Sequence, residues 1–326
     1  MSLKYALIKL LADGKFHSGE ELGQSLQITR SAIWKMIKQI AEMGIDIQSV
    51  KGKGYKIDNG LDLLNLDAIK NKLSDSALKQ VHLEVLNEVD STNQYLLNHA
   101  SEKKSGTIVF AEYQKQGRGR RLRKWISPFG GNIIFSILWS FNKDPSELGG
   151  LSLAAGVAVA NALERVGIHN IKLKWPNDIL WDNKKIAGIL IEMSGESYST
   201  TQVIIGIGIN IHMPSQVAID QQWIDLARIT GQRPERNCIA AYIVEEIIEM
   251  MTIFQQKGFK AYAKYWRALD AYYDQQVEIS TPSKKYVGIA KGINANGELL
   301  LQTAEEKEVR FLHGEVSLRL AAETIL

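Results

Sequence analysis

The residues with the strongest chemical character lie in one stretch, Glu112 to Trp125, which we call the basic loop. Like charges this close repel one another, and each buried guanidinium would need its own partner. We therefore expect the loop to be neither a core element nor compact without counter-charge. Glycines let backbone N–H groups approach an oxyanion, which favours a polyanionic ligand, although a solvated basic loop is the alternative. Its glycines and cations cluster in Gly117, Arg118, Gly119, Arg120, Arg121, Arg123 and Lys124, and Lys115 precedes this cluster.

The basic loop lies between two segments with the composition of buried strands. Thr107 to Ala111 precedes it, and Asn132 to Trp139 follows it. A loop between two such strands emerges at the edge of a sheet, where binding sites are common. We therefore expect a site there.

A second polar motif, Asp90-Ser91-Thr92-Asn93, precedes a helix expected to run to Ala100. Capping the helix needs only one of these side chains. The other hydroxyl and amide groups would then be exposed at the helix N-terminus, where they could meet an anion or a carbonyl group. The motif predicts either this arrangement or a simple cap.

Two strand ends also carry polar or small residues. Lys174-Trp175-Pro176-Asn177-Asp178 ends a strand where polar groups cluster, and Lys184-Lys185 lead into the next one. Within the alternating run Gln202 to Asn210, the glycines Gly206 and Gly208 share a face with Asn210. Small residues on one sheet face leave room for something flat, or allow a helix to pack closely.

The elements that must position these residues are read from hydrophobic periodicity. Residues 212–235 lack a clear period and are expected to form a long loop. We predict strands at 81–86, 107–111, 132–139, up to Lys174, at 186–193 and at 202–210, and helices at 151–166, 238–254 and 259–269.

Common catalytic motifs are absent from the sequence. It has no Gly-x-Ser-x-Gly and no His-x-x-x-His, and Leu122 stands where the third glycine of Gly-x-Gly-x-x-Gly would be. Cations, amides and glycines remain. This set suits phosphoryl or nucleotidyl transfer, in which positioning and charge neutralisation do most of the catalysis.

The first 60 residues predict a winged helix-turn-helix. Leu3 to Leu11 has helical spacing, Ser18 and Glu21 form a capping box, and Thr29 can cap a third helix. A hairpin with a basic tip follows, and a third helix of this size fits the major groove. A three-helix bundle for protein contacts is the alternative. The expected DNA-facing residues are Arg30, Ser31, Trp34, Lys35, Lys38, Lys51 and Lys53, with Trp34 either a thymine contact or a packing residue.

Short strand-like runs begin at Gln276, and Asn296-Gly297 is a hairpin signal. They predict a small barrel of about 50 residues. The runs are 277–279, 286–293, 299–302, 309–312 and 316–320.

Composition limits the protein class. The chain has 326 residues, 45% of them hydrophobic, and a net charge of +3, so the distribution of charge matters more than its sum. Cys238 is the single cysteine, which excludes intramolecular disulfides and fits a reducing cytoplasm. No stretch reaches ~18 uninterrupted apolar residues, so we expect neither a membrane span nor a membrane partner.

The order and spacing of these motifs resemble the family of bifunctional biotin–protein ligases that also repress the biotin operon. The resemblance covers nearly the full length: the winged helix-turn-helix, 90–94, 112–125, 127–130, 174–178, 185–190, 206–210 and the closing Gly314-Glu315-Val316-Ser317-Leu318-Arg319.

The resemblance implies an α+β multidomain fold. Its expected parts are a winged helix-turn-helix (1–60), a class II synthetase-like catalytic domain with a mixed sheet and flanking helices (61–271), and an SH3-like barrel (272–326). It also implies ATP-dependent conversion of biotin to biotinoyl-AMP and transfer to a lysine of a biotin carboxyl carrier protein. Operator DNA would be bound by a homodimer that the adenylate promotes.

Residue roles follow from the same resemblance. Biotin is expected against Ser91, Thr92, Asn93, Gln114 and the backbone of Arg118 and Gly188. Arg118, Gly119 and Arg120 match a loop that closes over biotin and adenylate, Trp125 an aromatic near adenine, and Asn210 a phosphate-side contact. Gly117 and Asn177 are further expected biotin- or adenylate-binding residues. Arg118, Arg120, Lys185 and Asp178 form the expected catalytic set. Mg²⁺ is expected to be held mainly through nucleotide phosphates, with no protein metal site.

One departure and two rival functions accompany this prediction. Leu122 replaces the glycine usual in the family, so we expect a stiffer loop or one anchored by an apolar contact. One rival is a transcription factor whose central domain only senses a ligand. The other is a lipoate or other acyl ligase, against which the N-terminal domain and the Gly-Arg-Gly-Arg-Arg run both argue.

Overall fold

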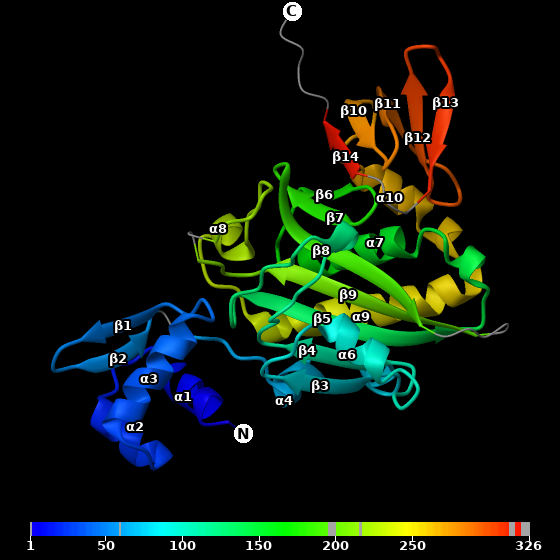
Figure 1. Ribbon diagram of the computed structural model, residues 1–326. Coiled ribbons are helices and arrows are strands. Elements are labelled where there is room, and N and C mark those ends of the chain that lie inside the picture. Colours follow the sequence, from blue (N-terminus) through cyan, green and yellow to red (C-terminus); the bar gives the residue numbers. More distant parts are fainter. Residues whose placement is uncertain (1, 59, 195–199, 215–216, 313–316, 321–326) are drawn as a thin grey trace, which may run out of the picture.

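The computed structural model describes residues 2–58, 60–194, 200–214, 217–312 and 317–320. The chain forms a small helical domain, a central sheet covered by helices, and a small β-domain, in that order (Figure 1). This is the architecture predicted from the sequence.

The N-terminal domain is a winged helix-turn-helix, as predicted. Ser18 and Glu21 form the capping box of the second helix, and the Thr29 hydroxyl accepts from the N–H of Ala32 to start the third. The buried Ile33 and Ile37 lie on one face of that helix, as the 3.6-residue period requires. Its elements are α1 (Leu3–Leu11), α2 (Gly19–Leu26), α3 (Arg30–Ala41), β1 (Ile47–Val50) and β2 (Gly54–Ile57).

The central sheet has seven strands in the order β3-β4-β5-β9-β8-β7-β6. β3 and β4 pair in parallel and the other ladders are antiparallel, so the sheet is mixed. Its strands are β3 (His82–Leu86), β4 (Thr107–Ala111), β5 (Asn132–Phe141), β6 (Ile171–Lys174), β7 (Asp178–Trp181), β8 (Lys184–Ser194) and β9 (Thr201–Asn210).

Helices cover both faces of this sheet (Figure 1). α7 (Leu151–Glu164) and α9 (Arg236–Lys257) pack with the main apolar core on one face, whereas α6 (Thr92–Asn98) lies on the other. The remaining helices are α4 (Leu66–Lys70), α5 (Asp75–Leu78), α8 (Leu226–Thr230), α10 (Ala263–Leu269) and the 3-10 turns η1 (Arg120–Leu122), η2 (Pro145–Leu148) and η3 (Phe259–Ala261).

Two expectations about local structure were wrong, and one strand was not predicted. Residues 212–235 contain α8, whose N–H groups are capped by Asp225. Asp178–Trp181 is a strand, too short for a period to be visible between its flanking turns. The helix expected at 259–269 is divided into η3 and α10.

The C-terminal domain is a five-stranded antiparallel sheet in the order β13-β12-β11-β10-β14. The predicted turn at Gly297 is present, and the Trp175 indole N–H donates to the Gly297 carbonyl at 3.1 Å. Gly314, Glu315 and Val316 of the closing motif lie outside the described residues. The strands are β10 (Gln276–Ser280), β11 (Lys285–Ile293), β12 (Leu299–Thr303), β13 (Glu308–Phe311) and β14 (Ser317–Leu320).

Among the described residues, one stretch is long and apolar enough to cross a membrane, Pro145–Glu164, with a hydropathy of 1.3. Within the fold, 72% of that window is buried. Most of it is α7, whose side chains pack against the sheet and α9. We therefore assign it to the core.

Asp270, which follows α10, has an unusual environment. Its Oδ1 accepts from the Tyr272 N–H at 3.0 Å, but its buried Oδ2 has no partner. Burial raises the pKa of Asp270 to about 6. The folded protein therefore holds a proton that the unfolded chain releases near pH ~4, and stability falls as pH rises between these values.

Asp270→Asn imitates the protonated carboxyl and keeps the oxygen that accepts from Tyr272. We expect the variant to be more stable than the parent by about 3 kcal/mol at neutral pH, with the difference vanishing below pH ~4. Urea unfolding across this range measures it. A difference independent of pH would contradict the explanation.

Candidate active site

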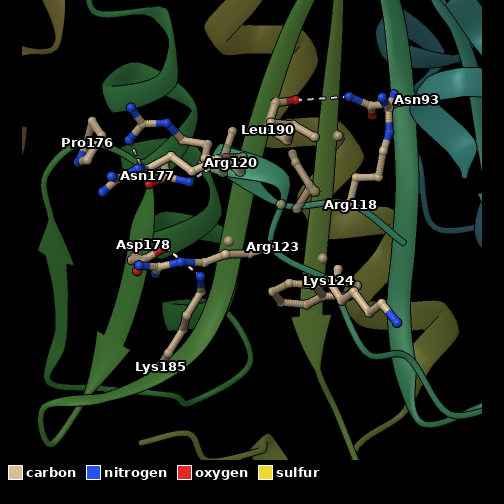
Figure 2. A pocket seen from close by; sticks show the side chains of 18 of the residues that line it. Asn93, Arg118, Arg120, Arg123, Lys124, Pro176, Asn177, Asp178, Lys185 and Leu190 are labelled. Atoms are coloured by element: carbon tan, nitrogen blue, oxygen red, sulfur yellow. Dashed lines mark hydrogen bonds and ion pairs between the residues drawn. The ribbon is translucent and has the colours of Figure 1, made fainter. Parts of the chain in front are cut away.

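The polar motifs meet in one cavity, formed by the start of α6, the basic loop, the end of β6 and the middle of β8 and β9 (Figure 2). Predicted residues that line it are Ser91, Thr92, Asn93, Gln114, Arg118, Gly119, Arg120, Trp125, Asn177, Asp178, Lys185 and Gly188. Gly117 and Asn210 are not among them.

At the start of α6, one polar residue caps the helix and the next ones face the cavity. The Ser91 hydroxyl accepts from the Gln94 N–H and caps the helix. The carbonyl oxygen of the Gln114 side chain accepts from the backbone N–H of Thr92 at 2.8 Å and lies 3.1 Å from its hydroxyl. Ser91 therefore caps the helix, and its neighbour Thr92 is held at the cavity by Gln114 of the basic loop.

Asn93 is held by two strands, β8 and β5. Its Nδ2 donates to the Glu192 carboxylate at 2.8 Å and the Leu190 carbonyl at 3.3 Å, and its Oδ1 lies 2.5 Å from the Ser136 hydroxyl. A Cβ on Gly206 would lie 2.2 Å from that Oδ1. This glycine is needed because the asparagine occupies the space that a side chain would fill.

The flat group over the other glycine is the Trp125 indole. A Cβ on Gly208 would lie 2.5 Å from its ring, and a Cβ on Gly188 would lie 3.2 Å from it. Close packing of the long helix 151–166, the alternative explanation for the glycines, is wrong, because this helix (α7) lies on the opposite face with Ile207 and Ile209. The Trp125 Nε1, buried at the cavity, has no hydrogen-bond partner among the described residues.

The basic loop is compact, contrary to our expectation. Its backbone closes on itself through Gly119 N–H to Arg123 carbonyl (2.7 Å) and Trp125 N–H to Gly117 carbonyl (2.9 Å) bonds. Arg118 donates to both oxygens of Glu192 at 3.1 and 3.2 Å. Protein carboxylates provide the counter-charge that we had assigned to a ligand alone.

A second ion pair lies deeper in the cavity. Lys185 Nζ is 2.6 Å from Asp178 Oδ1, and Arg120 donates to the Asn177 side-chain oxygen at 3.4 Å (Figure 2). Burial lowers the pKa of Lys174, with Lys185 adding to the effect and Asp178 opposing it. Burial likewise lowers the pKa of Arg120. The cations thus outnumber the carboxylates here, which favours an anionic ligand.

Two predicted residues support the site from outside the cavity. A Cβ on Gly117 would lie 2.4 Å from the Trp125 carbonyl oxygen, so this glycine allows the loop's backbone to close. Asn210 donates to the carbonyls of Lys185 (3.3 Å) and Ile224 (3.2 Å) and accepts from Asn132. Its amide fixes the strand that carries Lys185.

Leu122 does not anchor the loop. Its side chain is 98% exposed, so the expected apolar contact is wrong. Its φ of 58° lies in the left-handed region that glycine tolerates best.

The predicted DNA-facing residues all lie on the exposed surface of α3 and the β1–β2 hairpin. Trp34 is 49% exposed, and the Lys38 ammonium lies 3.8 Å from its ring centroid. Trp34 is therefore a surface residue with a cation stacked on it, rather than a packing residue.

The described residues of the whole chain include no group of three or more His, Cys, Asp or Glu that could hold a metal.

Sequence reasoning missed three supporting residues. Ser136 is the one polar residue within the apolar run Ile133–Trp139, which is a usable signal. Glu192 alternates in register with Gly188 and Leu190 along β8, but nothing in the sequence joins it to Arg118.

The third is Arg236, fully buried beside Glu112 at 2.8 Å. It also donates to the carbonyl of Asn132 at 2.7 Å and to that of Asp62. Glu112 accepts from the N–H of Leu64. Glu112 begins the basic loop and Asn132 begins the strand that follows it. The ion pair therefore joins both of these positions to the linker at Asp62 and Leu64.

The fold and site together define a class: a winged helix-turn-helix domain joined to a mixed-sheet domain with a cation-lined cavity. Three family models match the chain, namely the biotin/lipoate A/B protein ligase family (residues 85–210), an HTH domain (3–56) and the biotin protein ligase C terminal domain (273–319). The sequence is 40% identical to the bifunctional ligase/repressor BirA of Salmonella typhimurium, over 97% of each chain. It is 30% identical to that of Bacillus subtilis, over 93% of this chain and 95% of that one. The chain belongs to the family of BirA-type bifunctional ligase/repressors.

The structure is similar to that of the biotin protein ligase from Aquifex aeolicus in complex with biotin and ATP. The TM-score is 0.64 at 32% sequence identity, and the match covers 74% of this chain and 99% of that one.

Arg236→Met is expected to lower the free energy of unfolding by about 3–5 kcal/mol, because it leaves the Glu112 carboxylate buried and unpaired. Adding Glu112→Gln, which keeps an acceptor for Leu64, should restore most of the loss. Urea unfolding compares the variants. A double variant no more stable than Arg236→Met alone would contradict this account of the ion pair.

Proposed function

We propose that this protein is an ATP-dependent biotin–protein ligase that forms biotinoyl-5'-AMP and biotinylates a lysine of a biotin carboxyl carrier protein. The same chain represses transcription of biotin synthesis genes, with biotinoyl-AMP as corepressor. The observation that carries the proposal is the meeting of Arg118, Arg120 and Lys185 with the buried start of α6 in one cavity. The proposed parts are a DNA-binding domain (1–60), a catalytic domain (61–271) and a C-terminal domain (272–326).

Biotin is proposed to lie against Ser91, Thr92, Asn93 and Gln114, which are all at least 92% buried and held by hydrogen bonds. A neutral ring with amide donors and acceptors suits such a fixed polar surface, because unpaired buried groups would discriminate against wrong ligands. The backbone of Arg118 and Gly188 completes this proposed half of the site.

In the first step, a biotin carboxylate oxygen bonds to the α-phosphorus of ATP, and pyrophosphate leaves. Negative charges approach one another, so the cations at the cavity lower the barrier by offsetting the repulsion. Arg118 and Arg120 reach the cavity from the basic loop, and Lys185 reaches it from β8. Mg²⁺ held mainly by nucleotide phosphates would supply further charge neutralisation.

In the second step, the amine of the carrier lysine attacks the acyl carbon, and AMP leaves with its charge. The same cations assist this departure. Asp178 is the proposed acceptor of the amine's proton, and its 2.6 Å contact with Lys185 keeps it at the cavity. Trp125 is proposed to lie near the adenine, with the basic loop becoming more ordered when the adenylate binds, and Asn210 to act on the phosphate side.

Lys185→Ala should reduce adenylate formation by about 10²–10³-fold without changing the fold, because it removes a cation from the place where charge develops. Lys184→Ala is the matched control, because Lys184 is adjacent to Lys185 in the sequence but its side chain is 42% exposed and lies outside the cavity. Biotin-dependent exchange of pyrophosphate into ATP measures the step. Full activity of Lys185→Ala would refute the site assignment, and equal exchange with lipoate would favour the acyl-ligase alternative.

For repression, we propose that α3 enters the major groove of operator DNA through Arg30, Ser31, Trp34, Lys35 and Lys38. Lys51 and Lys53 of the hairpin would contact phosphates. We further propose that biotinoyl-AMP promotes a homodimer, and that the protein works in the cytoplasm. A transcription factor that only senses a ligand would leave Arg118 and Lys185 without a task.

Lys51→Ala with Lys53→Ala should weaken binding to any duplex and lower the slope of log K against log salt by about 2, because each phosphate contact contributes ~0.9. Lys257→Ala with Lys260→Ala removes the same charge from an exposed surface elsewhere. Fluorescence anisotropy with a labelled duplex of random sequence measures both. Equal slopes in the two double variants would exclude hairpin contacts with phosphates.

A further inference from the structure

Glu88 lies where the helical domain meets the catalytic domain, in the connection between β3 and α6. Its Oε2 accepts from Lys4 Nζ at 3.0 Å and from the Tyr5 hydroxyl at 2.5 Å, both on α1. Its Oε1 contacts the ammonium of Lys115, which belongs to the basic loop. One carboxylate thus joins the DNA-binding domain to the loop.

Both catalytic-domain segments at this junction lead directly into the cavity. Glu88 precedes the Ser91 cap, and Lys115 follows Gln114. The segments are paired, since the Val89 N–H donates to the Tyr113 carbonyl at 3.1 Å and the Lys115 N–H donates to the Val89 carbonyl at 3.0 Å. Glu88 is therefore connected to residues of the site through a continuous pair of hydrogen-bonded segments.

The helical domain also packs against Phe129, which follows the basic loop. Phe129 is buried in the apolar core of that domain, and its N–H donates to the Met43 carbonyl at 3.0 Å. Its ring stacks on that of Tyr5, with centroids 5.9 Å apart. Tyr5 therefore contacts Glu88, the partner of Lys115 in the basic loop, through its hydroxyl, and Phe129, which follows the loop, through its ring.

The carboxylate form of Glu88 is required for this junction. Burial opposes its charge, but hydrogen bonds from Lys115, Tyr5 and Lys4 prevail and lower the pKa of Glu88 to about 2. Both oxygens accept hydrogen bonds, so a glutamine could replace one acceptor but would direct its NH₂ group at the donors of the other.

We propose that Glu88 is a positioning residue shared by both activities: it ties α1 of the DNA-binding domain to the paired segments that carry Ser91 and Gln114. This rests on the proposed function. When biotin binds, it orders those two segments and so stabilises the contact between Glu88 and α1. By thermodynamic reciprocity, the contact between α1 and Glu88 strengthens biotin binding. The coupling passes through Glu88 and Tyr5, neither of which lines the cavity.

Two variants test the proposal from opposite sides of the junction. Glu88→Gln conserves shape, and Tyr5→Phe removes one hydroxyl from a residue of the DNA-binding domain. We expect each to raise KM for biotin by about fivefold while kcat stays within about twofold, and to reduce the gain in DNA affinity on adding biotin and ATP by a similar factor. A defect confined to the structure of the helical domain would leave KM for biotin unchanged.

Glu84→Gln is the matched control, because it breaks a Glu84–Lys103 ion pair on the neighbouring strand β3 that does not reach α1. Thermal unfolding of each variant confirms that it is folded. If Glu88→Gln and Tyr5→Phe leave both KM for biotin and the gain in DNA affinity at the values of the unaltered chain, the coupling is refuted. If the unaltered chain makes no adenylate, the proposed function fails instead, and calorimetric titration with biotin still compares the two variants with the parent.

Discussion

The site depends on how positive charge is balanced in a small volume. The basic loop and β8 bring Arg118, Arg120 and Lys185 to one cavity, and repulsion among them would open it. Glu192 and Asp178 prevent this by pairing with Arg118 and Lys185. Because cations still exceed carboxylates, the cavity keeps its preference for anions while the loop remains folded.

One of these carboxylates, Glu192, also organises the uncharged half of the site. Glu192 accepts from Asn93 as well as from Arg118, so the amide at the start of α6 and the guanidinium of the loop share one partner. Gly206 and Gly208 make space for Asn93 and Trp125 on the sheet face. Small residues, a shared carboxylate and a buried helix start therefore form one unit, and a change in any of them alters the others.

Much of this architecture depends on interactions between residues that are close in the sequence. Capping by Ser18 and Thr29, the alternation of β9 and the turn at Gly297 depend on neighbouring residues, so they could be predicted. The motifs around Ser91, Arg118 and Lys174 indicated the cavity because their order and spacing resemble one family. The basic loop misled us in one respect, since its own charges predict repulsion and the compensating Glu192 is distant in sequence. Short elements such as β7 and α8 carry too few residues for a period, and contacts such as Arg236–Glu112 exist only after the chain has folded.

The hydrogen bond between the Trp175 indole and Gly297 bears on how this chain can be divided. Trp175 precedes Asn177 and Asp178 of the cavity and is 1% exposed, while its partner belongs to a turn of the C-terminal sheet. That turn also lies against the residue preceding α7, since a Cβ on Gly297 would be 3.0 Å from Gly150. The C-terminal sheet therefore packs against residues that support the cavity. Removing it would expose Trp175, which is buried beside the cavity, to solvent.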